Sequence, residues 1–226
     1  MNITTMLGKW TPKKMNPAFW GKISAANVTL VASKISVWRD SSGNGRHLTE
    51  GTDSRRFEYV ENVINGHPVM RSNGNDKRLL WSAWSSPGAT QYDVFCIIKP
   101  VGVASWKQML AGPWATQLYV AGNPGVPQYY ANYTLAWPSA ISEAFHLIRY
   151  RFDNASNSAI SVDGAALVTK VEGAPSVAST WTTFGRADVY ALEGDFAELV
   201  ILPRYATDTE VARMKQYASS EYLISM

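Results

Sequence analysis

Short runs of aliphatic, β-branched and aromatic residues recur along the chain, separated by clusters of Gly, Asn, Asp, Ser and Pro. Runs of this kind, bounded by turn-forming residues, are typical of β-strands. Residues 94–98 are apolar at every position, which predicts a strand buried on both faces. The predicted strands are residues 28–31, 35–38, 63–64, 69–70, 79–81, 94–98, 108–111, 117–120, 128–135, 145–152, 159–162, 181–185 and 197–202.

Turn signals separate several of these strands. The dipeptides Asn65-Gly66 and Asp163-Gly164 predict tight turns, because Asn, Asp and Gly accept a positive φ. Residues 40–45 predict a further turn, in which Asp and Asn side chains bond the backbone. Strands do not alternate with helices, which disfavours a parallel α/β architecture.

One helix is predicted, at residues 208–224. It begins with a capping box, in which the Thr207 hydroxyl accepts from the backbone N–H of Glu210 and the Glu210 carboxylate reaches back. Apolar residues at helical spacing form one face, which predicts packing against the sheets. These residues are Val211, Met214, Ala218 and Tyr222.

Residues 1–22 are predicted to form an irregular arm, because Pro12 and Pro17 interrupt regular structure. The arm is rich in lysine, and a basic arm can dock on a partner. Residues 23–226 contain no Ser/Gly-rich or Pro-rich linker, which predicts a single domain. The candidate docking residues are Lys9, Trp10, Lys13, Lys14, Phe19, Trp20 and Lys22.

Three segments carry a resemblance to a known family: residues 37–45 (VWRDSSGNG), 64–70 (INGHPVM) and 194–202 (GDFAELVIL). Together they resemble the concanavalin A-like (laminin G-like) lectin and glucanase domains found in phage virion and bacterial surface proteins. The resemblance implies an all-β fold, an antiparallel jelly-roll β-sandwich with an irregular N-terminal arm and one C-terminal α-helix.

Composition and charge narrow the function classes. Hydrophobic residues make up 46% of the 226 positions, enough for a sizeable core, and the net charge of +3 does not indicate a nucleic-acid partner. The single cysteine, Cys96, excludes an intramolecular disulfide, and its apolar surroundings predict an inert buried thiol. No secretory signal is visible at the start and no apolar run is long enough to insert in a membrane, which predicts synthesis in a cytoplasm.

A possible catalytic pattern is Glu193, Asp195 and Glu198, which resembles the E-x-D-x-x-E signature of glucanases with this fold. The resemblance implies Glu193 as nucleophile, Asp195 as helper and Glu198 as acid/base. Gly194, however, stands where those enzymes carry a bulky aliphatic residue, and the motif lies close to the end of the chain. The alternative interpretation is a turn that leads into a strand.

The sequence does not indicate a metal or cofactor site. His47, His67 and His146 do not follow the spacing of metal ligands. Oxygen-bearing residues at 40–44 and 73–76 are the only suggestion of calcium, and turn chemistry accounts for them. No cofactor is therefore predicted.

Carbohydrate binding is the activity that this fold suggests most directly, because sugars stack on aromatic rings while polar side chains bind their hydroxyls. The candidate residues are Trp81, Trp84, Trp106, Trp114, Tyr129, Tyr130 and Asp76. An exposed aromatic shelf would favour this activity.

The resulting hypothesis is a non-enzymatic virion surface protein, such as a capsid decoration, head-fibre or tail-fibre component. It would assemble in the host cytoplasm with other virion proteins, as a homo-oligomer or symmetric array, and bind host-surface glycans. Two alternatives stay open: a stand-alone carbohydrate-binding adhesin, and a glycoside hydrolase that uses Glu193, Asp195 and Glu198.

Overall fold

The computed structural model describes residues 9–74, 76–81, 84, 91–101, 107–111, 117–121, 126–130, 134–153, 158–169, 182–186 and 193–226. Within these residues, hydrogen-bonded pairing joins 17 strands into one continuous network. The strand pairings among these residues are antiparallel, which confirms the all-β antiparallel class.

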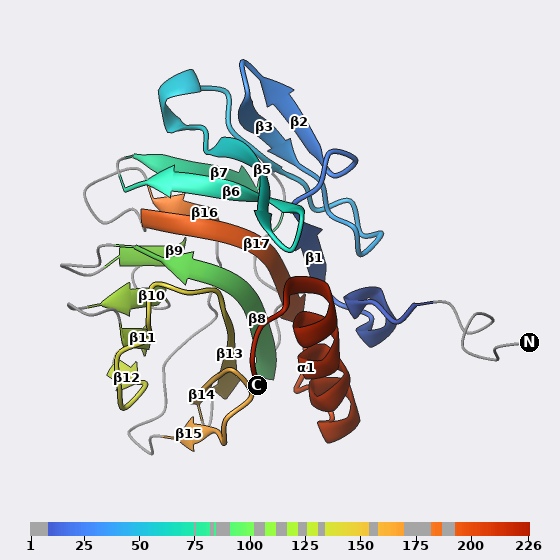
Figure 1. Cartoon of the computed structure of the whole chain (residues 1–226), viewed down its shortest axis with the longest axis vertical. Coiled ribbons are helices and arrows are strands. Elements are labelled where there is room, and N and C mark those ends of the chain that lie inside the picture. Colours follow the sequence, from blue (N-terminus) through green and yellow to red (C-terminus); the bar gives the residue numbers. More distant parts are fainter. Residues whose placement is uncertain are drawn as a thin grey trace, which may run out of the picture.

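The network folds into two layers (Figure 1). The first layer runs in the order β5 (Glu58–Ile64), β6 (His67–Asn73), β17 (Glu193–Leu202), β8 (Gln91–Pro100), β13 (His146–Asp153), β14 (Ala159–Val162) and β15 (Val168–Thr169). The second runs in the order β4 (Leu48–Thr49), β7 (Lys77–Trp81), β16 (Thr183–Arg186), β9 (Lys107–Ala111), β10 (Gln117–Ala121), β11 (Val126–Tyr130) and β12 (Thr134–Ala136). The hairpin of β2 (Val28–Val31) and β3 (Lys34–Trp38) joins them, because β3 pairs with both β4 and β5.

Two hydrophobic cores hold the domain together. The inner core lies between the layers and includes Trp38, Leu79, Ile148 and Phe196. The outer core lies between the first layer and the helix α1 (Asp208–Tyr222). Strand β8 contributes to both, with Val94 facing the inner core and Phe95 the outer core, which explains its continuous apolar run.

Helix α1 is the one α-helix in the described part of the chain, and it lies beside β8 and β17 (Figure 1). The predicted capping box between Thr207 and Glu210 is present. Met214, Ala218 and Tyr222 are buried against the first layer, as the apolar spacing predicts. The helix ends at Tyr222, two residues before the predicted end, because Leu223 adopts a left-handed conformation.

Residues 9–22 differ from the predicted irregular arm. Residues 1–8 lie outside the described residues, Pro12–Met15 forms a short 3-10 helix (η2), and β1 (Phe19–Lys22) pairs with β17. Phe19 is fully buried in the inner core. The segment is therefore built into the sandwich, because pairing along the free edge of β17 overrides the breaks imposed by the prolines.

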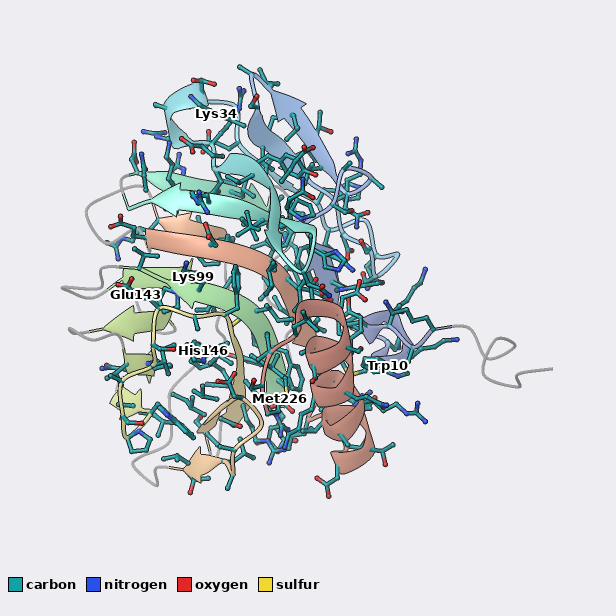
Figure 2. All side chains as sticks on the ribbon, in the orientation of Figure 1. Trp10, Lys34, Lys99, Glu143, His146 and Met226 are labelled. Carbon is teal, nitrogen blue, oxygen red and sulfur yellow. The ribbon has the colours of Figure 1, made fainter. Side chains whose placement is uncertain are left out.

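The predicted docking residues mostly contact this chain itself. Trp10 packs edge-on against Tyr217 of α1, with ring centroids 5.8 Å apart, and Figure 2 shows it beside the helix. Lys9 and Lys22 form ion pairs with Glu221 on the same helix. Lys9, Lys13 and Lys14 are exposed, and of these Lys13 and Lys14 form no ion pair with the described residues.

A β-bulge in β17 sets the direction of Glu198. The register with β8 shifts between Phe196 and Glu198. Phe196 and Leu199 face the inner core, whereas Ala197 packs in the outer core and Glu198 bonds to α1. The extra residue therefore turns a carboxylate away from the inner core and toward the helix.

Candidate functional site

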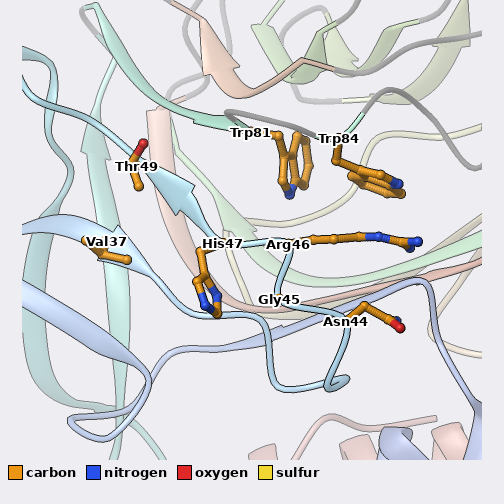
Figure 3. A pocket seen from close by; sticks show the side chains of 8 residues that line it. All are labelled: Val37, Asn44, Gly45, Arg46, His47, Thr49, Trp81 and Trp84. Atoms are coloured by element: carbon orange, nitrogen blue, oxygen red, sulfur yellow. The ribbon is translucent and has the colours of Figure 1, made fainter.

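A pocket of about 460 Å³ opens where the loop after β3 meets the end of β7 (Figure 3). Pairing of β4 with β7 sets Leu48 opposite Trp81, which brings this loop beside Trp81 and Trp84. The pocket is lined by Val37, Asn44, Gly45, Arg46, His47, Thr49, Trp81 and Trp84. We refer to it as the Trp81/Trp84 pocket.

The loop that forms one wall is organised by Asp40. The Asp40 carboxylate accepts hydrogen bonds from the backbone N–H groups of Trp20, Ser42 and Arg46 and from the Ser42 hydroxyl. The backbone N–H of Asp40 donates to Nδ1 of His47 at 3.0 Å. These bonds are the turn chemistry that the sequence predicts for residues 40–45, and they hold Arg46 and His47 at the pocket.

The opposite wall is aromatic. The rings of Trp81 and Trp84 meet edge-to-face with centroids 5.2 Å apart. Their exposed fractions are 6% and 9%, so they form a recessed wall rather than an exposed shelf. The indole Nε1 of Trp81 is buried without a hydrogen-bond partner among the described residues. In Figure 3 this nitrogen points toward the side of the pocket where Arg46 and His47 lie.

Arg46 carries the charge of the pocket. Its guanidinium lies 5.0 Å from the ring centroid of Trp84, a cation–π contact. Its Nη1 donates to the backbone carbonyl of Ala18 at 2.7 Å. The amide of Asn44 donates to the carbonyls of Pro17 and Ala18, which anchors the second polar side chain of this wall.

The predicted sugar-binding residues are only partly brought together. Trp81 and Trp84 line one pocket, whereas Asp76 lies elsewhere and pairs with Arg55 at 3.3 Å. Trp106 and Trp114 lie outside the described residues, as do the side chains of Tyr129 and Tyr130, whose backbones belong to β11. Sequence reasoning did not select Arg46, because the β4–β7 pairing that places it beside Trp84 is non-local.

The three carboxyls of the E-x-D-x-x-E pattern lie in β17, and the turn predicted there is absent. Asp195 is 3% exposed and bound by Nε and Nη2 of Arg71 at 2.6 and 2.9 Å. Glu198 is 2% exposed beneath α1. None of the three carboxyls lines the Trp81/Trp84 pocket.

Burial raises the pKa of Glu198, and its hydrogen bonds only partly oppose this effect. The donors are Trp20 Nε1 at 2.6 Å, the Tyr217 hydroxyl at 2.9 Å and the Tyr222 hydroxyl at 2.5 Å. The carboxylate thus joins β1, β17 and α1. Its contacts favour a structural role.

A second polar cluster joins Ser142, His146 and Asp163. His146 Nδ1 lies 2.6 Å from Asp163, and its Nε2 lies 3.1 Å from both the hydroxyl and the backbone carbonyl of Ser142. Burial lowers the pKa of His146, but hydrogen bonding and charge from Asp163 outweigh this and raise it. A carbonyl oxygen can only accept, so Nε2 donates a hydrogen bond here. This geometry favours an imidazolium that links two loops, rather than a base that would activate Ser142.

Metal ligands do not converge in the described part of the chain: no group of three or more His, Cys, Asp or Glu side chains is placed to hold an ion. Cys96 is buried, and burial raises the pKa of its thiol far above the usual range. No helix among the described residues is long and apolar enough to cross a membrane.

Comparison with known proteins identifies the fold. No protein-family model and no curated protein sequence matches the chain. Among solved structures, domain 4 of AbnA, a GH43 extracellular arabinanase from Geobacillus stearothermophilus in complex with arabinotriose, is similar with a TM-score of 0.61 and 14% identity, over 88% of this chain and 98% of that one. The Trypanosoma rangeli sialidase matches 88% of this chain and 32% of its own, at 15% identity and a TM-score of 0.58.

In other similar structures, too, the match covers only part of the solved chain. A GH54 α-L-arabinofuranosidase matches 85% of this chain and 51% of its own, at 12% identity and a TM-score of 0.61. The binding domain of botulinum neurotoxin DC has a TM-score of 0.63 at 8% identity, over 91% of this chain and 52% of its own. The chain thus spans about a third to a half of the sialidase and arabinofuranosidase chains, and what it shares with these structures is the β-sandwich fold.

Proposed function

We propose that this chain is a non-enzymatic carbohydrate-binding β-sandwich whose site is the Trp81/Trp84 pocket. The observation that carries the proposal is the unpartnered indole Nε1–H of Trp81, held in an aromatic wall that faces Arg46 and His47. A buried donor without a partner costs about 1–3 kcal/mol, and a sugar hydroxyl in the pocket would remove that cost. The volume, about 460 Å³, lies in the range of small-molecule sites, which is about 300–1,000 Å³.

The similar structures support the same class of function. The AbnA domain is described in complex with arabinotriose, so a sandwich of this size and shape binds a sugar chain. Identity of 14% carries over no binding residue, and the pocket is therefore argued from the residues of this chain alone.

Binding without cleavage is proposed because the candidate catalytic carboxyls are engaged elsewhere. Asp195 is occupied by Arg71, and Glu198 by the hydroxyls of α1. A retaining glycosidase needs two carboxyls about 5–5.5 Å apart at the scissile bond. The virion setting, with other virion proteins and symmetric copies as partners, stays a prediction of the sequence resemblance.

A glycan array tests the proposal. The wild-type chain is compared with Trp81→Phe, which keeps an aromatic ring but removes the Nε1–H donor, and with Trp10→Phe, a control that lies against α1. We expect specific binding by wild type and the control, and a loss of about 5- to 10-fold in affinity for Trp81→Phe, as expected for one hydrogen bond. Absence of binding to every glycan by the wild-type chain would overturn the proposal.

A further inference from the structure

Arg46 differs from the other well-placed arginines of this molecule. Among the described residues, Arg71, Arg78, Arg149 and Arg204 each bind a carboxylate within 3.0 Å. No carboxylate among the described residues is paired with the Arg46 guanidinium. Arg46 is nevertheless half-buried, and its guanidinium is held by Trp84 and the Ala18 carbonyl. An arginine oriented in this way keeps most of its five N–H donors for another acceptor.

The remaining polar groups of the pocket are mostly donors. The Trp81 indole can only donate, and the described residues that line the pocket include no Asp or Glu. The nearest carboxylate of the loop, Asp40, is saturated by the backbone N–H groups of Trp20, Ser42 and Arg46 and by the Ser42 hydroxyl. The pocket therefore supplies positive charge and donors, with few acceptors for the hydroxyl hydrogens of a neutral sugar.

We propose that the Trp81/Trp84 pocket selects sugars that carry a carboxylate, and that Arg46 binds the carboxylate. This inference rests on the proposed carbohydrate-binding function. A carboxylate accepts hydrogen bonds and donates none, which matches the donor-rich lining, and its planar pair of oxygens fits the fork of a guanidinium. Trp84 holds the guanidinium from one side and leaves its donor edge for the ligand.

The test uses sugars that differ in one group: methyl β-D-glucoside against methyl β-D-glucuronide, with N-acetylneuraminic acid as a second carboxylate source. Affinity is measured by isothermal titration calorimetry for wild type, Arg46→Gln and Arg46→Lys. Arg213→Gln, at an exposed position of α1, is the control for net charge. Thermal melts identify any variant that does not fold.

We expect wild type and Arg213→Gln to bind glucuronide or N-acetylneuraminic acid about 10- to 100-fold more tightly than glucoside, as a charge-assisted hydrogen bond implies. Arg46→Gln should bind the acidic sugars no more tightly than glucoside, and Arg46→Lys should retain part of the preference because the charge remains but the fork is lost. Which acid binds more tightly distinguishes the two carboxylate sources.

The failures are distinguishable. If neither neutral nor acidic sugars bind the wild-type chain, the proposed function itself fails. If both bind with equal affinity, or if the folded Arg46→Gln variant keeps the preference for acidic sugars, the carboxylate selectivity assigned to Arg46 is overturned while carbohydrate binding stands.

Discussion

Replacing Tyr222 by Phe should loosen α1, because it removes one of the hydrogen bonds that a buried carboxylate receives. The Tyr222 hydroxyl lies 2.5 Å from Glu198, and both side chains are 2% exposed. A hydrogen bond to a charged group contributes about 1.5–3 kcal/mol. For a domain of this size each kcal/mol shifts Tm by about 2–4 °C, so we expect Tyr222→Phe to lower Tm by about 3–12 °C.

The assay is thermal unfolding followed by circular dichroism, with Tyr59→Phe as the control. Tyr59 is half-buried against the inner core, and no described hydrogen bond involves its hydroxyl. The control should melt within about 2 °C of wild type, as surface-like substitutions do. If Tyr222→Phe melts with the control, the hydroxyl does not bind an essential carboxylate and the structural role of Glu198 is refuted.

A pH series separates burial of the Glu198 charge from its hydrogen bonds. Because burial raises the pKa of Glu198 above its ordinary 4.5, the folded state binds the proton more tightly than the unfolded state does. The stability of wild type relative to Glu198→Gln should therefore fall as the pH rises from the ordinary pKa through the folded one. A constant difference across this range would contradict the assigned direction.

Three further predictions concern stability. Gly194 has a φ of +143°, and a Cβ there would lie 2.2 Å from a carbonyl oxygen of β8. Gly194→Ala should therefore lower the free energy of unfolding, measured by chemical denaturation, by about 1–3 kcal/mol or more, whereas Gly51→Ala, in open space, should lower it by under about 0.5 kcal/mol. Equal losses would contradict the strain at Gly194. Burial raises the pKa of Glu221, but the lysines bound to it outweigh this effect and lower the pKa to about 2. The stability that ionised Glu221 contributes is therefore present above the ordinary pKa of 4.5 and lost as the pH falls toward 2. The Tm of Glu221→Gln should lack this acid-sensitive part, and identical acid profiles of variant and wild type would refute the ion pairs. Because the pKa of His146 is raised in the folded state, protonated His146 stabilises the fold fully below pH 6.5, and this stabilisation is lost as the pH rises through the folded pKa. The urea midpoint should therefore fall over this pH range, and Asp163→Asn should abolish that fall. An unchanged pH profile in the variant would refute the pairing.

Local signals in the sequence account for much of the fold. Asn65 and Gly66 have φ of 47° and 75°, as the predicted tight turn requires. The capping box of Thr207 and Glu210 starts the helix at the predicted residue. Such features depend on a few neighbouring residues, which is why the sequence alone predicts them.

Features that depend on distant segments were missed. The four residues of β1 form a strand because they pair with β17. Their own composition does not predict a strand next to Pro17. The bulge at Ala197, which turns Glu198 toward α1, arises in the pairing of β17 with β8. For the same reason, two of the predicted tryptophans could be selected by type, but their cationic neighbour Arg46 required the pairing of β4 with β7.

The indole N–H of Trp81 provides the most direct test of carbohydrate binding in the pocket. Its signal in a ¹⁵N-resolved NMR spectrum, assigned with Trp81→Phe, is followed as arabinotriose and then methyl β-D-glucuronide is added. Trp38, which is also buried with an unpartnered Nε1 but does not line the pocket, is the internal reference. We predict that a sugar shifts the Trp81 signal downfield as the nitrogen gains an acceptor and leaves Trp38 unchanged; a Trp81 signal unmoved by either sugar would contradict the assignment of this pocket.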